Sequence, residues 1–83
     1  MESFDYNAAA ELFPSRRYAK SSRDHYRRFK TAAEAIRYII EDVPGTWLIG
    51  SLLEVDERRY DAAGIRALYD ADSYPLHRLK AVA

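Results

Sequence analysis

The chain has 83 residues, a formal net charge of zero and no cysteine. A chain of this length forms one domain, residues 1–83, with a small core. The lack of cysteine excludes disulfide bonds, thiolate zinc sites and a cysteine nucleophile. No apolar run reaches the ~20 residues that span a bilayer, and the N-terminus carries acids where a signal peptide carries cations. We therefore expect a cytoplasmic protein that does not contact membranes.

Positive and negative charges occupy different parts of the sequence. Residues 14–30 contain seven Lys or Arg and one acid, whereas residues 41–72 contain eight acids and three bases. Such a dipolar surface can steer charged partners even at zero net charge. In the alternative arrangement, the two blocks face each other within the fold or across a dimer.

The first half of the chain predicts two paired strands followed by a helix. The strands are expected around residues 11–13 and 25–29, with a basic loop over residues 14–23 between them. Thr31 and Glu34 have capping-box spacing, so a helix is expected to begin after Thr31 and to end at Pro44-Gly45. One continuous helix over residues 22–43 is the alternative, because its apolar residues keep helical spacing across Thr31.

The second half predicts a hairpin followed by another helix. Trp47, Ile49, Leu53 and Val55 alternate on one face of an expected strand, and Leu48 and Leu52 lie on the other face. Residues 56 and 57 are expected to turn the chain into a short return strand over residues 58–60. Residue 61 is an aspartate in N-cap position for a helix in AAGIRALYDAD, residues 62–72.

The two halves resemble each other. YRRFKTAAEAIRYIIED and DERRYDAAGIRALYDAD both read as a short strand that ends in an aromatic residue, then a capping residue, then a helix. Two strand-to-helix units place both helices on one side of a small sheet. The predicted fold class is therefore α+β, with a three- to four-stranded, mainly antiparallel sheet and two helices on one face.

Residue patterns that support catalysis are sparse. His25 lies beside Asp24 and near Ser22, but close neighbours in sequence rarely form a productive triad. The acids of the second half lack the glycine-bent loop of a calcium site, and the three glycines stand apart, so no phosphate-binding loop is present. We expect no enzymatic activity, no metal site and no cofactor.

Binding is better supported than catalysis, and two surfaces are candidates. The basic one comprises Arg16, Arg17, Tyr18, Lys20, Arg23, Arg27 and Arg28. The acidic alternative comprises Glu54, Asp56, Glu57, Asp61, Asp70 and Asp72. Of the seven tyrosines, Tyr26, Tyr38 and Tyr69 are expected to pack in the core, whereas Tyr6, Tyr18 and Tyr74 are freer for contacts.

Two resemblances bear on the setting of the protein. The segments AELFPSR, YRRFKTAAEAIRYIIEDVP, EVDERRYDAAGIRALYD and SYPLHR together resemble a group of short bacterial proteins without an accepted activity. In size, lack of cysteine and segregated charge, the chain is similar in style to anti-CRISPR inhibitors from phages and mobile elements. That similarity has no diagnostic motif and implies no residue roles. It implies that a charged, non-catalytic surface of the protein occupies a nucleic-acid-binding groove on a larger complex.

The expected function is therefore that of a non-enzymatic inhibitor or adaptor that binds a larger protein or ribonucleoprotein complex, most concretely a CRISPR effector. One alternative is a nucleic-acid-binding regulator, in which the basic segment over residues 16–30 contacts phosphates and Tyr18 stacks on a base. The pI of about 6.7 argues against this alternative. Another is a homodimeric structural protein that uses Leu48 and Leu52; both monomer and homodimer fit the sequence.

Overall fold

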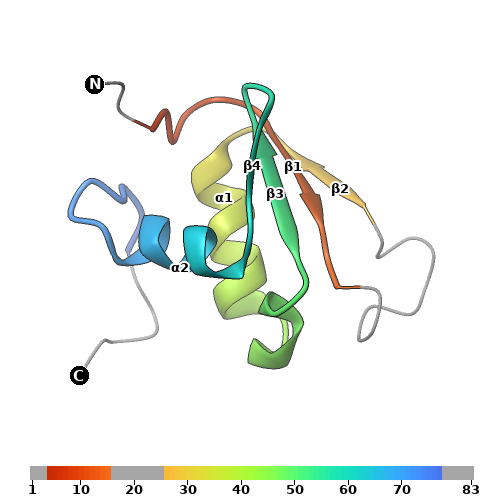
Figure 1. The fold of residues 1–83 in the computed structure, drawn as a ribbon. Coiled ribbons are helices and arrows are strands. Elements are labelled where there is room, and N and C mark those ends of the chain that lie inside the picture. Colours follow the sequence, from red (N-terminus) through yellow and green to blue (C-terminus); the bar gives the residue numbers. More distant parts are fainter. Residues whose placement is uncertain (1–3, 16–25, 78–83) are drawn as a thin grey trace.

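The computed structural model describes residues 4–15 and 26–77. Within these ranges, the centre is a four-stranded antiparallel sheet in the order β2-β1-β3-β4 (Figure 1). The strands are β1 (Ala10–Phe13), β2 (Arg27–Phe29), β3 (Leu52–Val55) and β4 (Arg58–Tyr60). The helices are α1 (Ala32–Arg37), its π-helical continuation η2 (Tyr38–Asp42), the 3-10 helix η3 (Gly45–Leu48) and α2 (Ala62–Asp70). This architecture confirms the predicted α+β class.

Both α-helices pack on the same side of the sheet. α1 contacts β1, β2 and β3, and α2 contacts β3, β4 and α1. Alternate strand residues point to this side, and Leu12 and Leu53 there are completely buried. They pack with Ile36 of α1 and Ile65 of α2, which are also completely buried. The hydrophobic core therefore lies between the helices and one face of the sheet.

Both predicted helix starts are confirmed by their capping bonds. The Thr31 hydroxyl accepts a hydrogen bond from the Glu34 backbone N–H at 3.2 Å, and the Asp61 carboxylate accepts one from the Gly64 N–H at 3.0 Å. These bonds satisfy backbone donors that the first helical turn leaves unpaired. Residues 27–29 pair with β1 as a strand, so the single helix over residues 22–43 does not form.

The two strand-to-helix units share the same hairpin register. In the first hairpin the pairs are Ala10–Phe29, Glu11–Arg28 and Leu12–Arg27, and in the second they are Leu53–Tyr60, Glu54–Arg59 and Val55–Arg58. β1 and β3 then pair antiparallel at the centre, with Glu11 opposite Glu54. The two hairpins are thus related by an approximate twofold axis through this glutamate pair, which extends the likeness seen in the sequence.

The strand predicted to begin at Trp47 begins instead at Leu52. Residues Gly45–Leu48 form a 3-10 helix, and Ile49, expected on the buried face, is 73% exposed. Gly50 has a φ of 90°, a conformation that favours glycine, and the Ser51 hydroxyl donates to the Trp47 carbonyl. This turn breaks the apparent alternation, and the expected shared face of Leu48 and Leu52 is therefore wrong.

The tyrosine assignments were partly wrong. Tyr6 and Tyr74, expected to be free, are only 7% and 6% exposed. Tyr6 donates its hydroxyl to the Leu68 carbonyl at 2.8 Å, and its ring lies 6.0 Å from that of Tyr74. Tyr26, expected in the core, is 45% exposed, whereas Tyr69 is fully buried as predicted. Burial therefore follows tertiary contacts of the chain ends, which local spacing does not encode.

Candidate functional site

The sheet face opposite the helices, called here the open face, has a row of four charged side chains across it. Glu11 lies opposite Arg28 on one side and Glu54 on the other, and Glu54 lies opposite Arg59. Directly opposed residues of an antiparallel sheet share a face, and residues 11 and 54 alternate with buried Leu12 and Leu53. The charged row (Arg28, Glu11, Glu54, Arg59) therefore reads plus, minus, minus, plus.

The two glutamates of the charged row are close like charges. Directly opposed residues have Cβ atoms about 5 Å apart, and like charges in this position destabilise a sheet. Both glutamates are half-buried, whereas Arg28 and Arg59 are exposed. None of the four forms an ion pair within 4.0 Å with another residue that the structure describes. The centre of the open face is therefore an anionic spot with a cation on each side.

Tyr26 fixes one end of this arrangement. Its hydroxyl donates a hydrogen bond to Glu11 Oε2 at 2.8 Å. This bond favours the neutral phenol, and together with the negative charges of Glu11 and Glu54 it raises the pKa of Tyr26 above the ordinary 10.0. Tyr26 therefore stays protonated at neutral pH and holds the Glu11 carboxylate in place on the sheet surface.

An apolar strip (Tyr26, Phe13, Leu52) runs beside the charged row. Phe13 lies opposite Leu52 in the register of β1 and β3, and its ring centroid is 5.4 Å from that of Tyr26. Phe13 and Leu52 are half-buried. Aromatic and aliphatic groups bordered by charge are a common composition of protein-binding surfaces.

A shallow depression lies at the other side of the charged row. It has a volume of about 180 Å³ and is lined by Ala9, Ala10, Glu11, Arg28, Glu54, Asp56 and Glu57. Pockets for drug-sized ligands measure roughly 300–1,000 Å³, so this depression has room for a single side chain. Four carboxylates and one guanidinium surround it, which favours a cationic group.

The structure separates the predicted basic residues. Arg16, Arg17, Tyr18, Lys20 and Arg23 lie outside the described residues. Arg28 belongs to the charged row, but Arg27 points to the helix side, where its guanidinium carbon lies 4.6 Å from the ring centroid of Tyr38. This cation–π contact gives Arg27 a packing role. Neighbouring strand residues face opposite ways, so Arg27 and Arg28 do not share a surface.

The predicted acidic residues also divide. Glu54, Asp56 and Glu57 meet at the depression. Asp61 caps α2, and Asp70 pairs with Arg66 one turn earlier at 3.2 Å, while Asp72 is exposed after the end of α2. Arg28 from the basic block lies among the acids of the depression. The two charge blocks therefore meet within the fold at this point.

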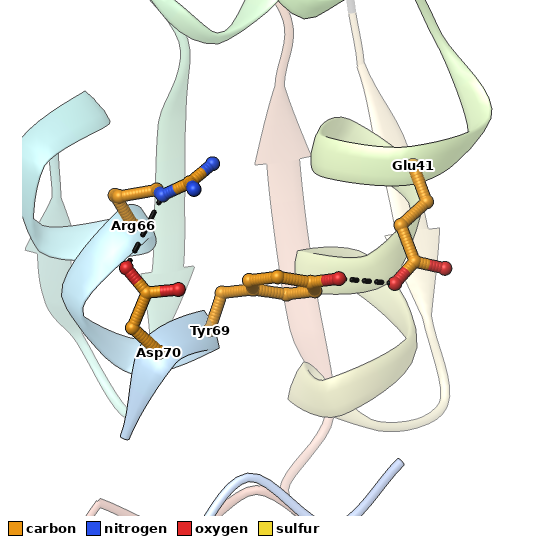
Figure 2. Close-up of polar contacts among 4 residues, drawn as sticks. All are labelled: Glu41, Arg66, Tyr69 and Asp70. Atoms are coloured by element: carbon orange, nitrogen blue, oxygen red, sulfur yellow. Dashed lines mark hydrogen bonds and ion pairs between the residues drawn. The ribbon is translucent and has the colours of Figure 1, made fainter. Parts of the chain in front are cut away.

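A second polar contact lies between the helices. Tyr69 points from α2 towards η2, and its hydroxyl donates to Glu41 Oε2 at 2.5 Å, whereas Arg66 and Asp70 of α2 pair with each other (Figure 2). Tyr69 is fully buried, and Glu41 lies in the π-helical turn. A buried hydroxyl needs a hydrogen-bond partner, so this contact fixes the packing of α2 on η2.

Glu11 and Arg59 belong to the site although the sequence did not single them out. Arg59 was visible as the counterpart of Arg28 in the two similar segments, and Glu11 lay in a predicted strand. What placed them together is the pairing of β1 with β3, which are nearly forty residues apart in the chain. Local sequence patterns contain no signal for that register.

Among the described residues, no group of three or more His, Asp or Glu is placed to hold a metal ion. In the same part of the chain, no helix has the length and apolar character needed to cross a membrane. Comparisons of the chain with protein-family models, with curated proteins and with solved structures found no match.

Proposed function

We propose that this protein is a non-enzymatic binding protein that attaches to a larger protein complex through the open face of its sheet. The observation that supports this proposal is the composition of that face, where the charged row and the apolar strip lie side by side on the strands. Rigid strands present such side chains at fixed spacing, which favours specific recognition. The helices cover the other face, whereas Arg28 and Arg59 on the open face are exposed.

Site-specific photo-crosslinking in bacterial cells tests this proposal. A photoreactive amino acid replaces Arg59, which is exposed on β4, or Ala67, which is exposed on α2. We expect a discrete crosslinked adduct from position 59 and none from position 67. An adduct from position 67 alone would place the partner on the helix side and refute the use of the open face.

The more specific proposal is that the partner is a CRISPR effector, whose engagement with nucleic acid the protein blocks in the cytoplasm of a bacterium. Support comes from the style of the sequence and from a sheet face whose half-buried Glu11 and Glu54 offer carboxylates at fixed spacing. A plasmid-interference assay tests it: expression of the protein should restore transformation of a targeted plasmid. Unchanged interference across the CRISPR classes tested would exclude a CRISPR effector as the partner. It would not affect the crosslinking test, which does not depend on the identity of the partner.

A nucleic-acid-binding regulator is the second candidate, and one observation favours it. Tyr26, just before β2, and Arg28 within β2 both lie on the open face, and Lys30 lines a neighbouring hollow with Arg28. A tyrosine beside cations suits a single-stranded nucleic acid. Glu11 and Glu54 lie next to them and repel phosphate, which makes this candidate weaker. Binding to a fluorescent oligonucleotide that falls steeply with salt would favour it.

A further inference from the structure

We infer that the open face accepts an extended basic segment of the partner protein, with an Arg or Lys side chain seated between Glu11 and Glu54. This inference rests on the proposed function and specifies the chemistry of the occupant. It also assigns positions on the sheet to the bound segment: the cation lies over the glutamate pair, and an apolar neighbour lies over the apolar strip.

The first argument is the charge pattern of the row. Glu11 and Glu54 are opposed at the centre of the sheet, and no described cation pairs with them within 4.0 Å. A cationic group above the pair would attract both carboxylates and remove their mutual repulsion. The outer positions of the row are Arg28 and Arg59, so the matching partner is cationic at its centre and neutral or acidic on either side.

The second argument is size. Neighbouring strands lie about 4.8 Å apart, so the four-residue row spans about 14 Å, which about four residues of an extended chain cover. The depression beside the row, with a volume of about 180 Å³, accepts one side chain. On the other side, the apolar strip offers Phe13 and Leu52 to an apolar neighbour of the cation. A short extended peptide with one central basic residue and an apolar residue beside it fits all three features.

The third argument disfavours a second copy of this chain that docks with its charged row in register. The row reads the same in both directions because of the approximate twofold axis through the glutamate pair. When two open faces meet row against row, glutamates therefore meet glutamates and arginines meet arginines. Like charges across an interface suppress association. This repulsion between copies in register favours a different polypeptide as the partner.

Fluorescence anisotropy with three probes tests the inference. The probes are a short labelled peptide with one central Arg flanked by Leu and Ser, the same peptide with Glu in place of Arg, and a single-stranded oligonucleotide. We expect the arginine peptide to bind more tightly than either anionic probe. Preferential binding of the glutamate peptide or the oligonucleotide would overturn the inference. The proposed use of the open face would then still be decided by the crosslinking test.

Charge-neutral variants locate the binding. The isosteric double variant Glu11→Gln/Glu54→Gln should weaken binding of the arginine peptide roughly tenfold, because two direct charge contacts are lost. The variant Arg28→Gln/Arg59→Gln should tighten it, because it removes repulsion within the same row. The control Asp42→Asn/Asp72→Asn removes two exposed acids elsewhere and should change the Kd by less than about twofold.

The Asp42→Asn/Asp72→Asn control changes the net charge by as much as the glutamate variant does, so it separates the charged row from general charge effects. Circular dichroism establishes that each variant is folded before its Kd is compared. Equal weakening by the control variant would show non-specific attraction and overturn the inference. Tighter binding after loss of the glutamates would also overturn it.

Discussion

The turn between β3 and β4 places two non-glycine residues in left-handed backbone, and relieving this strain should stabilise the protein. Asp56 and Glu57 have φ values of 53° and 67°, in the left-handed region that favours glycine. Left-handed backbone costs an L-residue about 1–2 kcal/mol, and Asp tolerates it better than Glu. Replacing Glu57 by Gly removes this strain, but it raises the entropy of the unfolded chain by part of the same amount.

The expected net effect of Glu57→Gly is a gain of about 0.5 kcal/mol, which for a domain of this size raises Tm by about 2–4 °C. Urea unfolding and calorimetry measure it. Glu57→Ala is the matched control, because it removes the same charge without making the left-handed conformation easier, and it should give no gain. A Glu57→Gly variant no more stable than Glu57→Ala would refute the strain argument.

Three further predictions concern single contacts. Gly50→Ala should destabilise the fold by about 1–2 kcal/mol in urea unfolding, because alanine strains a φ of 90°, and a neutral result would contradict the turn. Tyr69→Phe should cost about 1–2 kcal/mol through the lost bond to Glu41, and an unchanged urea midpoint would show that this bond contributes nothing to stability. The raised pKa of Tyr26 stabilises the fold below its ordinary value of 10.0, and this stabilisation is lost as pH rises through the folded pKa. Absorbance titration should show the pKa of Tyr26 falling in Glu11→Gln, and an unchanged value would exclude the hydrogen bond as its cause.

Much of the local structure was predictable because it rests on contacts between near neighbours. Thr31 and Asp61 show their roles through side chains that reach backbone N–H groups three residues away. The two hairpin strands that precede these caps were recognisable from their shared Arg-Arg-aromatic pattern. Such signals need no knowledge of the distant chain, and they led to the correct fold class.

The candidate site was less predictable, because it depends on pairing between distant segments. Arg27 and Arg28 look like one basic patch in sequence, but the strand turns them to opposite faces. Glu11 and Glu54 become a pair only through the register of β1 and β3. The apparent strand from Trp47 failed because a glycine turn at Gly50 separates η3 from β3.

Mapping the bound surface by NMR tests the central claim most directly. The protein labelled with ¹⁵N is titrated with the arginine-containing peptide, and backbone amide shifts are followed residue by residue. We expect the largest shifts in β1 and β3, centred on Glu11 and Glu54, with smaller ones at Tyr26. Shifts confined to α2, or to residues 16–25, would contradict the assignment of the open face as the binding surface.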